Sequence, residues 1–258
     1  MKIIILLEKY GGFCNRLFQS LHYHAFSIEK GIQFFNPSML GLLRFDNYFF
    51  YLLDNINNFL LKCISKFIKF LFGKDEVCFC ISKNIYIRFV SGWDYREYSL
   101  TAKHHEVLKK IYSFDKKLLS DKSMSFIRFL GFQKNKGKFL VGLHVRKGDY
   151  KNWNEGRYFF DNNFYKDVIF KLKNKLVADN KNPYFVVVSN ENLNSEIGAD
   201  SFYRGSWKED QMILQSCDLI IGPPSTFTLW ASYISKTPYV FINKNGEVNI
   251  QDQSICYG

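Results

Sequence analysis

A chain of 258 residues is long enough for one large domain or two of modest size. Its formal net charge of +11 at pH 7 favours an anionic partner, which could be nucleic acid, a phosphate-bearing small molecule or an anionic membrane surface. We expect no nucleic-acid partner, because the lysines are scattered and the sequence has no zinc-finger spacing, RNA-recognition signature or basic-zipper heptad.

Cysteine usage and apolar runs bear on the compartment. The six cysteines include no CxxC pair and follow no spacing typical of a disulfide framework or a zinc site, which favours a reducing compartment. The apolar run in the opening MKIIILLEKYGG is too short for a signal peptide and lacks a small-residue cleavage site. No apolar segment is long and charge-free enough to span a bilayer. We therefore expect a cytoplasmic protein.

The N-terminal part reads as a strand, a glycine-containing loop, a helix and a second strand. Residues 2–7 are the first strand, residues 15–30 are the helix, and residues 32–35 are the next strand. The loop sequence GGFCNR lacks the third glycine of a dinucleotide fingerprint, and no acidic residue follows the second strand to hold a ribose. The sequence also has no GK[ST] of a P-loop, so neither phosphate-binding motif is predicted here.

Residues 56–72 carry an amphipathic helical pattern. Lys62, Lys66 and Lys69 lie opposite an apolar face made of Ile56, Phe59, Leu60, Cys63, Ile64, Phe67, Ile68 and Leu71. Two interpretations stay open. The commoner one is a surface helix that docks its apolar face on the core, and the other is a basic helix that rests weakly on an anionic membrane.

A Lys-rich stretch over residues 115–138 marks a predicted domain boundary, and a regular alternation follows it. The predicted strands are continuous apolar runs, as expected of a parallel sheet that is covered on both faces, and the crossovers are helical. This half is therefore a doubly wound α/β domain. Its strands are expected at 138–145, 184–189, 218–222 and 238–242, and its helices at 162–177, 208–217 and 227–235.

Ligands of such sheets bind beyond the carboxyl ends of the strands, which directs attention to three loops. They read RKGDY, NENLNS and GPPST. In the first, Arg146 offers a planar fork for phosphate oxygens, Gly148 lets the backbone approach a ligand, and Asp149 could orient the arginine. A solvated ion pair at a strand end is the equally weighted alternative.

The third loop adds a second anion-binding candidate. Its two prolines stiffen the chain, and Ser225 and Thr226 lie where a helix begins. Hydroxyl groups together with the free N–H groups of a helix N-terminus can hold an anion. A plain N-cap would use the same residues. Two such loops on one sheet favour an anionic ligand more strongly than either loop alone.

Four segments, taken in order, resemble a known family. They are GGFCNRLFQ, GWDYREY, HVRKGDY and DQMILQSCDLIIGPPSTFTLW. The set resembles bacterial α-1,2-fucosyltransferases of glycosyltransferase family 11, within a superfamily that includes the α-1,6 and protein O-fucosyltransferases. The chain departs from the pattern at Cys14 and Arg16, which replace Gly and Gln, and at Pro224 and Leu229, which replace Asn and Trp. These changes leave the exact sugar and linkage open.

The resemblance implies a GT-B fold, with two Rossmann-like domains and a cleft between them. Residues 1–135 would form the acceptor-side domain, and residues 136–258 would bind the nucleotide sugar. The implied reaction transfers fucose, with inversion, from GDP-fucose to a hydroxyl of an oligosaccharide or lipid-linked glycan, as in cell-surface polysaccharide biosynthesis. The linkage would be α-1,2 to galactose. No metal is implied, and the sequence contains no DxD.

The resemblance also assigns roles. Arg146 would stabilise the departing diphosphate, because negative charge grows there in the transition state. His144 would shape the cleft or contact the nucleotide, although a packed core histidine explains it almost as well. Asp210 would accept the N1 and N2 protons of guanine, although an acid at a helix start needs no ligand to be explained.

The remaining roles concern the diphosphate, the cleft and the general base. Ser225, Thr226 and Phe227 would hold the diphosphate, while Gly11, Gly12 and Asn15 would face the cleft from the N-terminal domain. The general base would be Glu155, with Asp149 and Asp94 as rivals. Two other functions stay open: a glycosyltransferase with another nucleotide sugar, and a non-catalytic basic protein that binds an anionic surface through 56–72.

Overall fold

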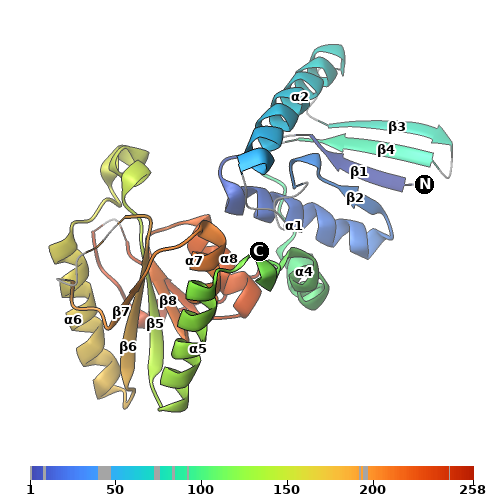
Figure 1. Cartoon of the computed structure of the whole chain (residues 1–258). Helices are drawn as coiled ribbons and strands as arrows, with labels where there is room; N and C mark the ends of the chain where they lie inside the picture. Colours follow the sequence, from blue (N-terminus) through green and yellow to red (C-terminus); the bar gives the residue numbers. More distant parts are fainter. Residues whose placement is uncertain are drawn as a thin grey trace. The chain divides into compact units, whose positions relative to one another are not determined.

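The computed structural model divides into two compact units, Met1–Leu118 with Tyr257–Gly258 and Leu119–Cys256 (Figure 1). Each unit has its own sheet with helices packed on it. The structure describes residues 2–7, 10–39, 48–72, 76–82, 85–91, 93–191, 193, 197–243 and 245–258.

In its described residues, the first unit is built on a four-stranded sheet in the order β2-β1-β4-β3. β1 is parallel to β2 and β4, and β3 is antiparallel to β4. The strands are β1 (Lys2–Leu6), β2 (Gln33–Phe35), β3 (Glu76–Ser82) and β4 (Ile85–Val90). The helices are α1 (Phe13–Lys30), α2 (Tyr48–Phe72), α3 (Tyr98–Lys103) and α4 (His105–Tyr112), with 3-10 turns η1 (Pro37–Met39) and η2 (Lys116–Leu118).

The predicted β-loop-α-β unit at the start of the chain is present. Gly12 is the N-cap of α1, and Gly31 ends the helix in the left-handed conformation at φ 62°. A left-handed residue at this position is a common helix stop, and glycine adopts it without strain. α1 buries one face against β1 and β4 in a core that contains Ile4, Leu6, Tyr23 and Val90.

α2 does not dock its predicted apolar face on the core, so the commoner of the two sequence interpretations is wrong for this helix. The helix instead buries a narrow line that contains Leu61 and Ser65, exposed by 6% and 7%. Most of the predicted apolar face is exposed: Ile56, Phe59, Leu60, Ile64, Phe67 and Leu71, joined by Phe70 and Phe72. Within the described residues, no helix combines the length and apolar character needed to cross a bilayer.

In its described residues, the second unit is built on a five-stranded, all-parallel sheet in the order β7-β6-β5-β8-β9. The strands are β5 (Phe139–Val145), β6 (Pro183–Ser189), β7 (Ser201–Tyr203), β8 (Leu219–Gly222) and β9 (Tyr239–Phe241). The helices are α5 (Asp121–Asn135), α6 (Asn162–Ala178), α7 (Trp207–Gln215) and α8 (Thr226–Ser235). The 3-10 turns are η3 (Gly148–Lys151), η4 (Trp153–Gly156) and η6 (Ile250–Asp252).

Separate apolar cores cover the two faces of this sheet. α6 packs Val168, Ile169 and Leu172 on one face, against β5, β6 and β8. α5, α7 and α8 pack on the other, where Leu130 and Ile213 are fully buried. Burial on both faces explains why these strands are continuous apolar runs, so the predicted doubly wound α/β domain is confirmed.

The predicted domain boundary at 135/136 differs from the division into units at 118/119. The Lys-rich stretch that suggested the boundary contains α5, which begins at an N-cap where Ser120 Oγ accepts the Ser123 N–H at 3.2 Å. The fully buried Leu130 packs this helix on the sheet of the second unit. The structure also adds β3, β4 and β7, which were not predicted.

Candidate active site

Within the described chain, the carboxyl ends of five parallel strands lie at one edge of the second sheet. Ligands of open α/β sheets bind beyond this edge. The loops after β5, β6 and β8 are the three that the sequence singled out, although Asn192 and residues 194–196 lie outside the described residues. A fourth loop follows β7, and it was not predicted.

Arg146 leaves the end of β5 and is held by an acid three residues later. Its Nε donates to Asp149 Oδ1 at 3.1 Å, and its Nη2 donates to Oδ2 at 2.8 Å. The guanidinium lies over the Tyr150 ring, 5.1 Å from the centroid, and the Tyr150 hydroxyl donates to the Pro224 carbonyl oxygen at 2.7 Å. A two-point pair of this kind fixes the plane of the guanidinium. The structure therefore places Arg146 and Asp149 beside the loop after β8.

This pairing changes the acidity of Asp149. The hydrogen bonds from Arg146 lower the pKa of the Asp149 carboxyl. A carboxylate with a lowered pKa binds a proton more weakly, which makes it a poorer general base near neutral pH. The geometry fits a residue that orients Arg146 better than one that accepts a proton.

The loop after β6 holds the loop after β5 through backbone N–H groups. Lys147 N donates to Asn190 Oδ1 at 3.1 Å, and Gly148 N donates to Glu191 Oε1 at 3.0 Å. Gly148 has φ 54°, and a Cβ there would lie 3.0 Å from Asn190 Nδ2. The left-handed conformation and this close approach explain why glycine occupies the position.

His144 is a buried, neutral imidazole behind the loop after β8. It is 5% exposed, its Nδ1 lies 3.0 Å from Thr228 Oγ1, and its ring centroid lies 4.8 Å from that of Phe227. Burial, with help from Arg146, lowers the pKa of His144 to about 3. Ser225 is the N-cap of α8, with its Oγ accepting the Phe227 N–H at 3.1 Å. His144 therefore packs against the first turn of α8 and carries no charge near pH 7.

Asp210 lies in the first turn of α7 and is 7% exposed. Its Oδ1 accepts the Gly205 N–H at 2.9 Å, whereas no hydrogen bond from the described residues reaches Oδ2. Burial raises the pKa of Asp210 to about 7. This carboxyl therefore changes charge near neutral pH and has one oxygen available to a ligand.

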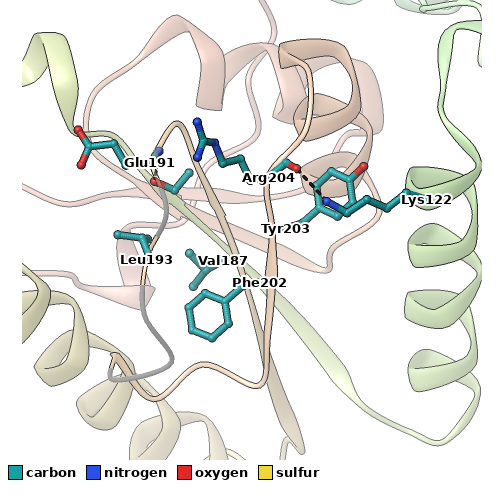
Figure 2. Close-up of a pocket in the computed structure, with 8 residues that line it drawn as sticks. Lys122, Val187, Glu191, Leu193, Phe202, Tyr203 and Arg204 are labelled. Carbon is teal, nitrogen blue, oxygen red and sulfur yellow. Dashed lines mark hydrogen bonds between the residues drawn. The ribbon is translucent and has the colours of Figure 1, made fainter.

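A pocket of about 200 Å³ opens between the loops after β6 and β7. Figure 2 shows Glu191 and Arg204 at one end and the apolar side chains Val187, Leu193 and Phe202 at the other. Lys122 reaches in from α5, with its Nζ 3.3 Å from the Arg204 carbonyl oxygen and 5.1 Å from the centroid of the Tyr203 ring. Two cations beside an apolar floor suit a ligand that joins a planar ring to an anionic group.

The pocket is linked to the residues predicted from the sequence. Glu191, at one end of the pocket, accepts from Gly148 of the Arg146 loop. Arg204 precedes Gly205, which donates to Asp210. One continuous edge of the second unit therefore carries the guanidinium, the titrating carboxyl and the pocket.

The family model described as "Glycosyl transferase family 11" matches residues 82–253, which is more than half of the chain. The chain belongs to glycosyltransferase family 11.

Curated relatives and solved structures agree with this family. The galactoside alpha-(1,2)-fucosyltransferase 2 of Mus musculus is 28% identical over 162 residues, and that of Rattus norvegicus is 28% identical over 163 residues. Each match covers 56% of this chain and 44% of the relative, so the chain spans less than half the length of these proteins.

Solved fucosyltransferases share the fold. Arabidopsis thaliana FUT1, in a structure with GDP, superposes with a TM-score of 0.52 at 11% identity and covers 98% of this chain and 74% of its own. NodZ from Bradyrhizobium gives a TM-score of 0.50 at 12% identity and covers 96% of this chain and 98% of its own. The GT-B-like fold of two α/β units predicted from the sequence is confirmed.

Glu155, the predicted general base, lies in an exposed turn of the second unit. Glu155 lies in η4, where it and Asn154 have the positive φ values 60° and 50°. Its side chain is 77% exposed and forms an ion pair with Arg157 at 2.6 Å. Two consecutive non-glycine residues in this conformation are unusual and can mark a functional turn. The assignment of the base to Glu155 stays a prediction.

Four further predicted residues belong to the first unit. Gly11 has φ 60°, and a Cβ there would lie 2.1 Å from Asn15 Nδ2, so the Asn15 side chain packs directly on the Gly11 backbone. Gly12 follows as the N-cap of α1, and Asp94 is exposed in the loop after β4. Arg16, which departs from the family pattern, is 2% exposed and donates to the Ser38 carbonyl oxygen at 3.0 Å. The Arg16 guanidinium is therefore buried inside the first unit, where it is bonded to η1.

Sequence reasoning missed the cations of the pocket. Lys122 was one of many lysines in a stretch taken for a boundary, and Arg204 follows a strand of three residues that was not predicted. The capping box at the start of α7, in which Ser206 and Glu209 bond each other's backbone N–H groups, is a local signal that could have located this turn.

Proposed function

We propose that this chain transfers fucose, with inversion, from GDP-fucose to a hydroxyl of a galactose-containing glycan. One observation carries the proposal: Asp149 holds Arg146 in a fixed plane beside the loop that begins α8, at the ligand-binding edge of a parallel sheet. Family membership and the galactoside α-1,2-fucosyltransferase relatives support this donor and linkage.

The chemistry requires stabilisation of a leaving group. As the bond from the sugar's anomeric carbon to the diphosphate breaks, negative charge accumulates on GDP. A guanidinium already fixed in orientation stabilises that charge without having to reorganise during the reaction. The N–H groups at the N-terminus of α8 provide a second region of partial positive charge that can bind the phosphates. Arg146 and α8 together therefore supply the charge stabilisation.

The guanosine part of the donor fits the rest of the edge. Asp210 Oδ2 accepts hydrogen bonds from the N1–H and N2–H groups of guanine, and the pocket with Lys122 and Arg204 receives the neighbouring part of the nucleotide. Structures of Arabidopsis FUT1 with GDP and of NodZ with GDP-fucose support a guanine nucleotide as ligand. The donor is the substrate of the reaction, and no resident cofactor is needed.

The reaction is proposed to be independent of metal, because the sequence has no DxD and Arg146 occupies the position where a charge is needed. We expect this chain to consume GDP-fucose faster than GDP-mannose, UDP-galactose or UDP-glucose, with or without excess EDTA. The measurement is release of nucleoside diphosphate, with a β-galactoside such as lactose as acceptor. Faster turnover of another nucleotide sugar would replace the donor, and loss of turnover in EDTA with recovery in Mn²⁺ would overturn metal independence.

A second proposal concerns α2, for which we infer weak association with an anionic membrane surface. The support is the exposed apolar face that contains Phe59, Phe67 and Phe70, exposed by 67%, 61% and 84%. The three lysines were predicted opposite this face, but at about 100° per residue Lys62, Lys66 and Lys69 lie along its flank beside Phe59, where they can contact lipid phosphates. Such contact would hold the enzyme at the inner face of the cytoplasmic membrane, near a lipid-linked acceptor.

Liposome sedimentation tests this second proposal. Each basic residue near an anionic surface contributes about 1 kcal/mol, so changing Lys62, Lys66 and Lys69 to Glu should abolish co-sedimentation with phosphatidylglycerol vesicles. The matched control changes Lys171, Lys173 and Lys175 of α6 to Glu, which alters the net charge equally. Equal loss in both variants would indicate unspecific charge attraction, and no sedimentation of the unaltered protein would refute the membrane interpretation.

A further inference from the structure

Two aromatic rings, the exposed Tyr10 and the half-buried Trp93, are stacked on each other in the first unit. Tyr10 and Trp93 have ring centroids 5.0 Å apart and an interplanar angle of 17°. Tyr10 follows β1 and Trp93 follows β4, which are parallel neighbours, so both residues lie beyond the carboxyl edge of the first sheet. Tyr10 remains 47% exposed although one of its faces is stacked. About half of Tyr10 is therefore accessible to a ligand.

The loop that carries Trp93 is fixed from several sides. The Arg96 guanidinium lies over the Trp93 ring, 4.2 Å from the centroid, and Nη1 donates to the carbonyl oxygens of Trp93 and, at 2.7 Å, of Tyr95. Tyr95 in turn stacks on the buried Tyr23 of α1, with centroids 4.4 Å apart. Trp93 is thus held in place before any ligand binds, which lowers the entropic cost of binding.

The next residues strengthen this attachment. Glu97 N donates to His22 Nδ1 at 3.0 Å, and His22 is fully buried in α1. Burial, and the positive charge of Arg96, lower the pKa of His22 to about 4. His22 is therefore a neutral acceptor at physiological pH, and the contact does not change with small changes in pH.

We propose that Tyr10 and Trp93 form an acceptor-sugar platform, on which the apolar face of a pyranose ring of the acceptor glycan stacks. The C–H bonds on one face of a galactose ring are complementary to the negative face of an aromatic ring. Hydroxyl groups at the sugar's rim need polar partners, and the exposed Asp94 follows Trp93 directly in the chain. The proposal deepens the proposed function and rests on it, since it names the substrate that this unit receives.

A nucleotide base is a less suitable occupant of this platform. A guanine nucleotide already has charge-bearing partners on the second unit, in Arg146, Asp210 and Arg204. The platform offers aromatic area, and its guanidinium is already occupied by the Trp93 ring and by backbone carbonyl oxygens, so it provides no free cation for a diphosphate. GDP binding to the platform is nevertheless an outcome that the experiment can detect.

The experiment compares Tyr10→Ala and Trp93→Ala with Tyr10→Phe, which keeps the ring. The control is Phe35→Ala, a change in an aromatic residue of β2 that is 40% exposed on the same unit. With lactose and N-acetyllactosamine as probes, we expect the acceptor KM to rise about tenfold in both alanine variants. Tyr10→Phe and Phe35→Ala should stay within about twofold of the unaltered protein, and the Kd of GDP should be unchanged throughout.

Direct sugar binding separates failure of the platform from failure of the proposed function. Saturation-transfer NMR with methyl β-galactoside should show transfer from protein to sugar protons in the unaltered chain and loss of this transfer in Tyr10→Ala. Normal acceptor KM values in the alanine variants, or sugar signals that do not depend on Tyr10, would overturn the platform while leaving fucose transfer intact. If the chain turns over no nucleotide sugar, the proposed function fails, and the NMR result alone decides the platform. A weakened Kd of GDP in Tyr10→Ala would reassign the rings to the donor.

Discussion

Replacing Arg146 by alanine is expected to lower kcat at least about a hundredfold, with a smaller effect on donor affinity. Arg146 acts on charge that develops as the diphosphate departs, and removing one such donor costs roughly 10²–10³ in rate. Because the interaction strengthens toward the transition state, the loss falls on kcat more than on binding. Lysine at this position should recover only part of the rate, since a point charge cannot span two oxygens as the planar fork does. Steady-state rates of GDP release from GDP-fucose provide the measurement.

The structure supplies a matched control for this substitution. Arg88 of β4 forms an ion pair with Glu76 at 2.6 Å, much as Arg146 pairs with Asp149 at 2.8 Å, and neither Arg88 nor Glu76 has a proposed role in the reaction. Exposed pairs of this kind contribute less than about 1 kcal/mol to stability, so neither alanine variant should shift Tm far. If Arg146 were only a strand-end ion pair, both variants would behave alike. An Arg146→Ala protein that turns over normally per folded molecule would remove Arg146 from the mechanism.

The second unit was predictable from the sequence because burial on both faces makes its strands conspicuous. β5 and β6 are apolar over nearly their whole length, and α6 begins at Asn162 as predicted. α5 was missed for a physical reason. Most lysines of the stretch 115–138 lie just outside the two ends of α5, and they drew attention away from the apolar side chains Phe126, Ile127 and Leu130 that pack the helix on the sheet.

The first unit was harder to predict, because some of its apolar residues do not lie in a core. The periodicity of α2 correctly predicted a helix, and its apolar face was expected to be buried. A hydrophobic period identifies the apolar face of a helix, but it does not identify the surface that covers this face. The buried line with Leu61 and Ser65 carries little apolar area and therefore gave no signal.

The candidate site was predictable where one loop carries both partners. Arg146 and Asp149 are three residues apart, so their pairing follows from local sequence. Arg204 and Lys122 are far apart in the chain, and they meet only because α5 packs against the end of β7, where the Phe126 ring contacts Tyr203. No local pattern links them, so the pocket could not be found before the sheet order was known.

The Asp210→Asn variant is expected to bind GDP about 10- to 100-fold more weakly than the unaltered protein, because a charge-assisted pair of hydrogen bonds to guanine is lost. Burial raises the pKa of Asp210 to about 7, so the charged acceptor is present above neutral pH and absent below it. Affinity for GDP should accordingly increase between pH 6 and pH 8. Calorimetric titration measures the affinity for GDP at each pH. Asp210→Asn is the control for the protonation of the nucleotide's own phosphate over the same range.

The stability of the same variant decides between the two explanations of Asp210. The folded-state pKa of about 7 lies above the ordinary aspartate pKa of 3.8, so the folded chain binds this proton more tightly than the unfolded chain. The resulting stability is present below about pH 4 and is lost as pH rises through 7, by up to about 4 kcal/mol. Asp210→Asn carries no such loss and should melt above the unaltered protein at pH 8. An acid that only complements the helix dipole predicts the opposite, since its charged form stabilises α7 at pH 8.

Glu209, the adjacent residue, is the control because its pKa is shifted in the opposite direction. Burial acts to raise its pKa, but hydrogen bonds from Ser120 and from the Ser206 backbone outweigh burial and lower the pKa to about 2. Its stabilising contribution is complete above about pH 4.5 and is lost as pH falls toward 2. Glu209→Gln should therefore melt below the unaltered protein at pH 8, and Asp210→Asn should melt above it. Both variants should approach the unaltered protein on acidification. If both variants melted early at pH 8 and Asp210→Asn bound GDP normally, Asp210 would be a helix-start acid with no part in recognising the nucleotide.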